Sequence, residues 1–336
     1  MRRSEIAIDL GALRRNVSRL RDVLGGTELW AVVKADAYGH GAADAARAAT
    51  DAGAAALCVA TVAEGLSLRR VLPGQRILVL GPTDEVREAR EARLELVVSR
   101  PPIPEDVPVH VKLDTGMGRY GFEEVPPLPA NVVALMTHLA TADNDATFAE
   151  QQLRRFREAA AGSGLTLHAA NSAAALRLPE SRLDAARCGI AIYGMSPFGT
   201  HPADDGLEPV LSWRSELAQV KQLQPGESTG YGRTFVAERP TWIGLVPLGY
   251  ADGFRRDLTG TEVLVDGERR QVVGTVSMDS FAVELGRELP VGTPVTLIGD
   301  GLLVEEHARR LGTITYELTA GLRASPDRAT RRVVDA

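Results

Sequence analysis

Hydrophobic positions recur in a regular rhythm between residues 28 and 188. A short apolar run is followed by a turn, and then by an Ala/Arg/Glu-rich segment whose apolar positions lie three or four residues apart. Apolar runs bounded by turn residues are typical of strands, whereas the longer segments with helical spacing predict helices. We predict strands over residues 28–35, 55–61, 76–81, 94–99, 107–114, 131–139, 165–170 and 183–188. We predict helices over residues 41–53, 62–72, 84–93 and 144–161, preceded by a strand over 6–10 and a helix over 11–24.

This alternation favours an α/β fold built on a closed barrel. Strands that alternate with helices pair in parallel, and eight such strands within about 170 residues favour a (β/α)8 barrel of the TIM type. An open, doubly wound sheet is the alternative. Residues 100–106 and 122–129 are rich in proline, which a helix interior does not tolerate, so we expect these two crossovers to be extended.

The pattern changes beyond about residue 220. Short β-rich runs separated by Gly, Pro and Asp follow over residues 244–249, 263–265, 272–276, 281–285 and 295–298. They predict a mostly-β C-terminal domain. We therefore expect a barrel domain over residues 1–222 and a mostly-β domain over residues 223–336.

Charge and composition exclude several classes of function. The chain has 336 residues, a formal net charge of −6 and no basic block, so we expect no nucleic-acid partner. The segment Met1–Glu5 leads into an amphipathic stretch, and no apolar run approaches the roughly 20 residues of a membrane span. We expect a cytoplasmic protein with no membrane partner. Cys58 and Cys188 lie in apolar runs without metal-ligand spacing, and we expect both to be reduced core residues and no metal to be bound.

The rarity of lysine draws attention to residue 34. Of the 38 basic residues only three are lysines, Lys34, Lys112 and Lys221. Lysine can lose its proton and act as a base or a Schiff-base nucleophile, which arginine cannot do. Lys34 ends the first barrel strand and precedes an aromatic residue, two glycines and a histidine, which predict a tight, polar turn after the strand. The alternative is a surface charge at the end of a strand.

Residues that can carry chemistry gather at the predicted strand ends. Active sites of (β/α)8 barrels lie at the carboxyl ends of their strands. These ends carry Lys34, Lys112, Arg119, His138, His168, Ser172 and Arg187. Ser172 and the Gly189-Ile190 backbone follow strands seven and eight, where such barrels bind phosphate, and a lysine nearby fits pyridoxal phosphate (PLP) held as a Schiff base. Taken singly, these histidines fit hydrogen-bonded core residues equally well, and Arg187 fits an ion-pair partner.

A set of motifs in order resembles the alanine racemase family over nearly the whole chain. The motifs are Ile8-Asp9-Leu10, residues 31–41 (AVVKADAYGHG), 112–119 (KLDTGMGR), 137–143 (THLATAD), 171–174 (NSAA), 187–194 (RCGIAIYG), 249–253 (GYADG), 277–279 (SMD) and 315–317 (TYE). The resemblance implies a PLP-dependent enzyme with an α/β barrel and a β domain.

The resemblance also implies the two bases of the reaction. Lys34 would carry PLP and act as the base on one face of the substrate Cα, and Tyr250 of the partner subunit would act on the other. His138 would orient the tyrosine. Arg119 and the backbone N–H of the partner's Met278 would bind the substrate carboxylate.

Further residues correspond to the cofactor site of the family. Arg187 would face the pyridine nitrogen with His168 behind it, and the phosphate would be held by Tyr38, Ser172, Gly189, Ile190 and Tyr316. Lys112 matches a lysine that is often carbamylated, which would make it an anion able to fix Arg119; an uncarbamylated ion pair is the alternative.

The implied function is interconversion of L- and D-alanine by a homodimer, which would supply D-alanine for peptidoglycan. A racemase for serine or for a broad range of amino acids is the nearest alternative. A non-catalytic PLP-binding protein would usually lack the β domain that carries Tyr250 and Met278. A decarboxylase of related fold would require an acidic residue where this chain has Arg187.

Overall fold

The computed structural model describes residues 3–336 and divides into two compact units. The barrel unit is Gly11–Glu208, and the β unit combines the described residues up to Leu10 with Pro209–Ala336. Residues 1 and 2, part of the segment used for the cytoplasmic expectation, lie outside the described residues. Within residues 3–336, no helix is long and apolar enough to cross a membrane.

Eight parallel strands close the barrel in sequence order. They are β2 (Glu28–Val32), β3 (Ala56–Val59), β4 (Arg76–Val79), β5 (Glu95–Val98), β6 (Val109–Lys112), β7 (Val132–Met136), β8 (Thr166–His168) and β9 (Ala185–Cys188), with β9 pairing back to β2. Every residue of β3, β6 and β9 is buried, as expected for parallel strands covered on both faces. The eight predicted strands and the closed barrel are confirmed.

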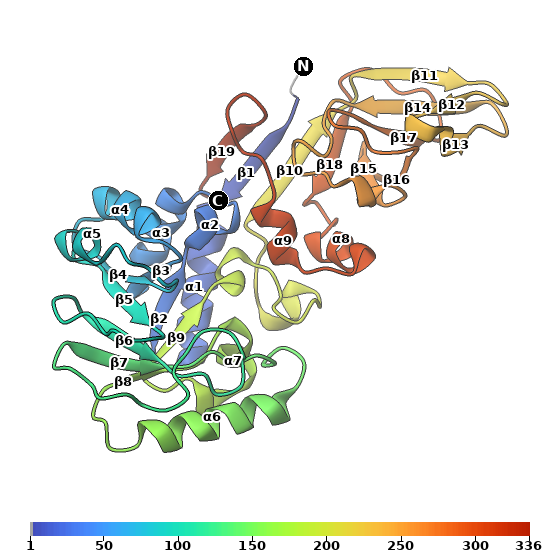
Figure 1. Ribbon diagram of the computed structural model, residues 1–336. Helices are drawn as coiled ribbons and strands as arrows, with labels where there is room; N and C mark the ends of the chain where they lie inside the picture. Colours follow the sequence, from blue (N-terminus) through green and yellow to red (C-terminus); the bar gives the residue numbers. More distant parts are fainter. Residues whose placement is uncertain (1–2) are drawn as a thin grey trace. The chain divides into compact units, whose positions relative to one another are not determined.

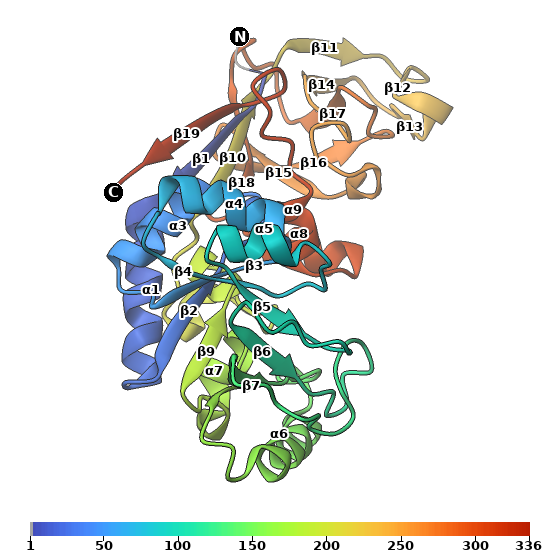
Figure 2. The ribbon, with the colours of Figure 1, turned by 60° about the vertical axis from the view of Figure 1, so that its left-hand side comes forward.

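Helices cover the outside of the barrel where the sequence allows them (Figures 1 and 2). They are α1 (Leu10–Leu24), α3 (Ala42–Asp51), α4 (Val62–Val71), α5 (Val86–Glu91), α6 (Ala146–Ala160) and α7 (Ser172–Arg177). Residues 99–108 and 119–131, which the structure describes throughout, contain no helix. The extended character of the two proline-rich crossovers is thus confirmed, because proline lacks the N–H that a helix interior requires.

The β unit is built on a nine-stranded sheet in the order β11-β14-β17-β16-β15-β18-β10-β1-β19. Its strands are β1 (Glu5–Asp9), β10 (Leu211–Glu216), β11 (Gln219–Leu223), β14 (Thr241–Val246), β15 (Glu262–Val265), β16 (Glu268–Val273), β17 (Phe281–Leu285), β18 (Pro294–Ile298) and β19 (Thr330–Val334). A small ladder of β12 (Ser228–Thr229) and β13 (Phe235–Val236) and two helices, α8 (Val304–Leu311) and α9 (Thr315–Ala320), complete the unit.

Both ends of the chain belong to this sheet. Strand β1 pairs antiparallel with β10 and parallel with β19 (Figure 1). The structure therefore differs from the division expected at residue 222. The N-terminal strand joins the β unit because the hydrogen-bonding groups on its two edges are paired there. Strand β10 lies before the expected boundary, and β11 spans it.

Candidate active site

The strand pairing brings the predicted rim residues of the barrel unit to one end. Lys112, the last residue of β6, lies opposite Met136 of β7, which in turn lies opposite His168 at the end of β8. Arg187 of β9 pairs with Trp30 of β2, four residues before Lys34. Because the strands are parallel, their carboxyl ends meet at one rim, as the sequence predicted.

The rim carries more positive than negative charge. Burial, followed by repulsion from Arg119, lowers the pKa of the Lys34 ammonium. The same causes, with Arg187, lower the pKa of Lys112 to about 8. Burial and these four cations together lower the pKa of His138 to about 3. Two lysines that lose their protons more readily than a free lysine, and a neutral imidazole, therefore lie in a field that attracts anions.

Lys34 begins a short helical turn, α2 (Lys34–Tyr38), of left-handed form. The four residues after the lysine have φ values of 51°, 50°, 55° and 55°. A left-handed conformation costs roughly 1–2 kcal/mol for each non-glycine residue, so surrounding contacts must hold it. Glu64 accepts a hydrogen bond from Ala35 N (2.8 Å), and Asp36 accepts one from Ala42 N (2.7 Å). The sequence predicted a tight polar turn here, but not its handedness.

The turn places Tyr38 against the loop that follows β9. A Cβ atom added to Gly189 would lie 2.5 Å from the Tyr38 hydroxyl, so only glycine allows this approach. Ser172 Oγ accepts hydrogen bonds from Gly189 N (3.0 Å) and Ala191 N (3.4 Å). The predicted phosphate residues of the barrel unit, Tyr38, Ser172, Gly189 and Ile190, thus form a cradle of backbone and hydroxyl groups.

Tyr193 supports this cradle, and the sequence interpretation gave it no role. Its fully buried hydroxyl donates to the carbonyl of Val32, two residues before Lys34, at 2.8 Å. Its ring packs against Tyr38 at 5.2 Å and stacks on His40 at 4.5 Å. A buried tyrosine inside an apolar run resembles an ordinary core residue, so the sequence offered no signal.

Arg187 is buried among neutral acceptors. Its Nη1 donates to His168 Nδ1 (2.7 Å) and to the carbonyl of His168 (3.0 Å). Its Nη2 donates to the carbonyls of Thr137 (2.9 Å) and Ala169 (3.1 Å) and to His138 Nδ1 (3.3 Å). Burial lowers the pKa of Arg187 to about 10, which leaves it protonated near neutral pH. The guanidinium is therefore a fixed cation held by carbonyls and imidazoles.

These contacts determine the histidine tautomers. A guanidinium has only donors, so His168 Nδ1 accepts and its proton sits on Nε2. That N–H donates to His110 Nδ1 at 2.8 Å, and His110 Nε2–H donates to Glu95 at 2.8 Å. Glu95 also accepts from Arg76 Nε at 2.8 Å. A chain of donors thus runs from Arg187 through two neutral histidines to a carboxylate.

The sequence interpretation found Arg187 and His168 but missed His110 and Glu95. His110 and Glu95 lie within or at the start of predicted strands and carried no motif of their own. Trp30 packs against both histidines of the chain, with its ring centroid 4.5 Å from that of His168 and 5.6 Å from that of His110. The only available signal was the polar side chain at an inward position of a buried strand, since such groups require partners.

His138 follows β7, and helix α6 holds its segment. Gln152 of α6, fully buried, donates to the carbonyl of His138 (3.3 Å) and accepts from Ala140 N (2.8 Å). Since His138 Nδ1 accepts from Arg187, the proton of the neutral ring sits on Nε2.

Arg119 ends a loop that Asp114 organises after β6. One carboxylate oxygen of Asp114 accepts from the backbone N–H groups of Gly116 (3.0 Å), Met117 (2.8 Å) and Gly118 (3.1 Å). Arg119 itself is exposed, and its charge acts on both Lys34 and Lys112.

Three predicted site residues belong to the β unit. Tyr250 and Met278 are exposed, with 43% and 52% of their surface accessible, and Tyr316 lies half-buried in α9. The loops of Tyr250 and Met278 are joined, because Tyr250 N donates to Ser277 O and Ala251 N to Met278 O, both at 3.1 Å.

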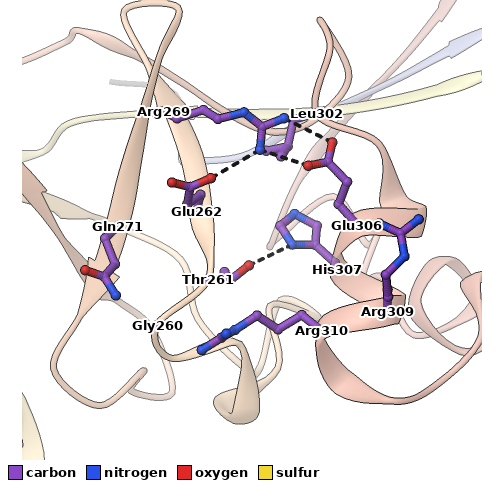
Figure 3. Close-up of a pocket in the computed structure, with 10 residues that line it drawn as sticks. All are labelled: Gly260, Thr261, Glu262, Arg269, Gln271, Leu302, Glu306, His307, Arg309 and Arg310. Atoms are coloured by element: carbon purple, nitrogen blue, oxygen red, sulfur yellow. Dashed lines mark hydrogen bonds and ion pairs between the residues drawn. The ribbon is translucent and has the colours of Figure 1, made fainter.

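A separate pocket of about 570 Å³ lies in the β unit between α8 and the β15–β16 hairpin (Figure 3). Arg269 crosses it to Glu262 (3.2 Å) and Glu306 (2.8 Å), and His307 contacts Thr261 (3.2 Å). None of the predicted site residues lines it. Its side chains bind one another and tie α8 to the hairpin.

Comparison with known proteins identifies the family. Residues 8–197 match the model of the alanine racemase N-terminal domain, and residues 210–330 match that of the C-terminal domain. The chain belongs to the alanine racemase family. Alanine racemase 1 of Bacillus subtilis strain 168 is 41% identical to it over 346 residues, covering 93% of this chain and 88% of the relative.

Solved structures of the family share both units. Alanine racemase from Streptomyces coelicolor A3(2) is 39% identical, with a TM-score of 0.91 over 99% of this chain and 98% of that one. Biosynthetic alanine racemase from Pseudomonas aeruginosa is 36% identical, with a TM-score of 0.91 over 99% of this chain and 100% of that one. The resemblance inferred from the motifs is confirmed, and the open-sheet alternative is wrong.

Proposed function

We propose that the protein is a PLP-dependent racemase that interconverts L- and D-alanine, with Lys34 and Tyr250 as opposing bases. Family membership supports the activity. The observation that carries this proposal is the environment of Lys34, an amine whose pKa is lowered by burial and by nearby arginines. The turn that follows it brings Tyr38 against the Gly189 backbone. We further propose a cytoplasmic homodimer with shared sites, which makes D-alanine for peptidoglycan.

The residues present fit PLP. The Gly189 backbone approaches the Tyr38 hydroxyl where a Cβ would clash, and Ser172 Oγ accepts two backbone N–H groups, which leaves its own proton to donate to a phosphate oxygen. Lys34 would hold the cofactor covalently, and the phosphate would be bound by Tyr38, Ser172, Gly189, Ile190 and Tyr316. Bound PLP supplies an electron sink that acidifies the Cα–H of the amino acid.

Arg187 would face the pyridine nitrogen, with His168 as its support. All its hydrogen-bond partners named above are carbonyls or neutral imidazoles, and the Glu95 carboxylate is reached only through two histidines. An arginine keeps its own proton, and the ring nitrogen then stays neutral. A neutral ring withdraws fewer electrons, which disfavours side reactions such as transamination.

Racemisation requires a base on each face of Cα, because the proton leaves one side and returns on the other. The lowered pKa of Lys34 increases the fraction of neutral amine able to take a proton. The exposed Tyr250 would serve on the opposite face in the partner subunit, with its oxygen oriented by the Nε2–H of His138. Arg119 and the backbone N–H of the partner's Met278 would bind the carboxylate.

The substrate could also be serine or a broader range of amino acids, and the family match does not distinguish these. An amino-acid panel with PLP present tests the proposal. We expect racemisation of alanine well above that of every other amino acid in the panel. Equal rates for several substrates would favour the broad-specificity alternative, and no racemisation would contradict an enzymatic role.

The cofactor assignment has its own test. Borohydride reduction of the PLP-loaded protein, followed by peptide mapping, should place the adduct on Lys34 and not on Lys112 or Lys221. An adduct on another lysine would contradict the role of Lys34.

A further inference from the structure

Four charged residues of the β unit form a cluster that draws on both ends of the chain. Arg3 contacts Asp252 (3.3 Å) and Asp279 (3.1 Å), and Arg328 contacts the same two carboxylates at 3.6 Å and 2.7 Å. We call these four residues the ion cluster. Each arginine bridges both aspartates, so the cluster is a closed ring of alternating charge.

One member of the ion cluster, Asp252, closes the turn that carries Tyr250. Asp252 is 1% exposed, and its Oδ2 accepts from Gly249 N at 2.8 Å. Asp252 N donates back to Gly249 O at 3.0 Å, and Phe254 N donates to the same carbonyl at 3.2 Å. Tyr250 is therefore held in a tight turn whose closing carboxylate is buried and needs cationic partners.

The second aspartate belongs to the loop of Met278. Asp279 follows Met278 directly, and the two backbone hydrogen bonds described above join this loop to Tyr250 and Ala251. Gly249 makes the close approach possible, since a Cβ there would lie 2.1 Å from the carbonyl of Ser277. The two loops thus form one surface, on which Tyr250 and Met278 are both exposed.

We propose that the ion cluster is a positioning device, which fixes the Tyr250 turn and the Met278 loop relative to each other for catalysis. Asp252, Asp279, Arg3 and Arg328 are positioning residues that touch neither substrate nor cofactor. This inference rests on the proposed function, in which Tyr250 is a base and the Met278 N–H binds carboxylate. Without the bridging arginines, the two loops would keep the backbone hydrogen bonds between them. The carboxylates of Asp252 and Asp279 would no longer be held together.

The pairing of the first and last strands brings both ends of the chain to the ion cluster. Thr330 N donates to Ser4 O at 2.9 Å, which ties the residue after Arg3 to the strand that follows Arg328. Strands β1 and β19 then run side by side in parallel (Figure 1). The arginine-rich C-terminal segment thereby supplies one of the two arginines of the ion cluster.

The test uses the PLP-loaded full-length enzyme with Asp279→Asn and Arg328→Gln, each of which leaves Asp252 at least one arginine. Asp300→Asn is the matched control, because it breaks an ion pair with Arg214 (2.8 Å) and Asp300 is 53% exposed, against 55% for Asp279. The measurements are kcat and KM for alanine, the melting temperature, and deuterium isotope effects with α-deuterated L- and D-alanine.

We expect kcat to fall on the order of ten-fold in Asp279→Asn and Arg328→Gln, less than the roughly 10²-fold loss that an ångström of misplacement can cause. KM should rise, because the Met278 N–H moves with the loop. The isotope effect should increase for one enantiomer more than for the other, since only one proton transfer uses Tyr250. L- and D-alanine have equal free energies, so kcat/KM must stay equal in both directions and cannot reveal this asymmetry.

The possible outcomes separate this inference from the proposed function. We expect Tyr250→Phe to slow α-proton abstraction from one enantiomer far more than from the other. Unchanged kcat and isotope effects in both cluster variants would overturn the positioning role, even if Tyr250→Phe shows this asymmetry. A lower melting temperature with isotope effects that change equally would indicate a structural role only and also overturn it. Equal, small effects of Tyr250→Phe on α-proton abstraction from the two enantiomers would instead overturn the two-base proposal, and the positioning role with it.

Discussion

Lys34 and Lys112 are two of the three lysines in the chain, and the fold makes both less basic than a free lysine. Burial contributes most, and neighbouring arginines add to it. The pKa of Lys112, about 8 against an ordinary 10.5, gives a few hundred-fold more neutral amine near pH 7. Carbon dioxide reacts with the neutral amine, so the same environment favours a carbamate, whose negative charge would then be stabilised by Arg119.

We therefore predict that Lys112 is carbamylated. Protein equilibrated with ¹³C-bicarbonate should show a carbamate NMR signal that disappears in Lys112→Arg. The exposed Lys221 provides the control, and Lys221→Arg should retain the signal. A signal that survives Lys112→Arg, or no signal at all, would favour the uncarbamylated ion pair.

His138 makes the stability of the fold depend on pH. Its pKa is about 3 in the folded protein and near 6.5 when the chain is unfolded. Below pH 6.5 the unfolded state binds a proton that the folded state does not, so this contribution to stability is complete above pH 6.5 and is lost as the pH falls towards 3. In His138→Asn, the free energy of unfolding should decline less steeply over this range.

Urea unfolding at a series of pH values measures this slope. His201 is exposed, and His201→Asn is the control. It should leave the dependence of the free energy of unfolding on pH unchanged. The same acid slope in His138→Asn as in the unaltered protein would show that His138 is not held neutral by the fold.

At the residue scale, the sequence predicted which residues lie at the barrel rim better than it predicted their hydrogen-bond partners. The strand ends marked out Lys34, Lys112, His138, His168 and Arg187, because parallel strands bring their carboxyl ends together. The hydrogen bonds of the Arg187–His168–His110–Glu95 chain join residues of four different strands, β9, β8, β6 and β5. Local sequence carries no information on such cross-strand contacts, so His110 and Glu95 could be found only in the structure.

At the scale of elements, the least predictable feature is the left-handed turn α2. The sequence Ala35-Asp36-Ala37-Tyr38 contains no glycine that would favour positive φ values. The turn is held by hydrogen bonds from Ala35 N to Glu64 and from Ala42 N to the Asp36 carboxylate, which local sequence does not reveal. The barrel strands were easier to predict, because burial on both faces leaves continuous apolar runs. Helices α8 and α9 were missed, since they are only eight and six residues long and lie beyond a series of β-rich runs.

Strain in α2 predicts that Ala35→Gly stabilises the protein. Glycine adopts positive φ without the side-chain clash, and Ala35 is exposed, so no packing is lost. We expect the free energy of unfolding to rise by about 0.5–1 kcal/mol, the strain relieved less the extra entropy of glycine in the unfolded chain.

The matched control is Ala63→Gly, at an exposed position inside the right-handed helix α4. There glycine should lower the free energy of unfolding by about 0.5–1 kcal/mol. Urea unfolding compares the two variants. Destabilisation of equal size at both positions would show that the left-handed turn is not strained.

At the scale of the whole molecule, the chain divides between its two units in a way that sequence order hides. Strand β1 belongs to the β unit although it precedes the barrel, because its hydrogen-bonding partners are β10 and β19. A boundary placed at residue 222, where short β-rich runs begin to dominate the sequence, therefore lies C-terminal to the start of the β unit at Pro209. The same unit exposes Tyr250 and Met278, which fits residues that serve a neighbouring subunit.

The central claim, that Lys34 and Tyr250 from different subunits act as opposing bases, is tested most directly by mixing two inactive proteins. Lys34→Ala and Tyr250→Ala chains, mixed one to one and allowed to exchange subunits, form heterodimers with one intact site and one doubly altered site. Random exchange makes half of the dimers heterodimers, so about a quarter of the activity of the unaltered enzyme should return. Activity that stays at the level of the separate variants, in a sample shown to contain heterodimers, would contradict the shared two-base site.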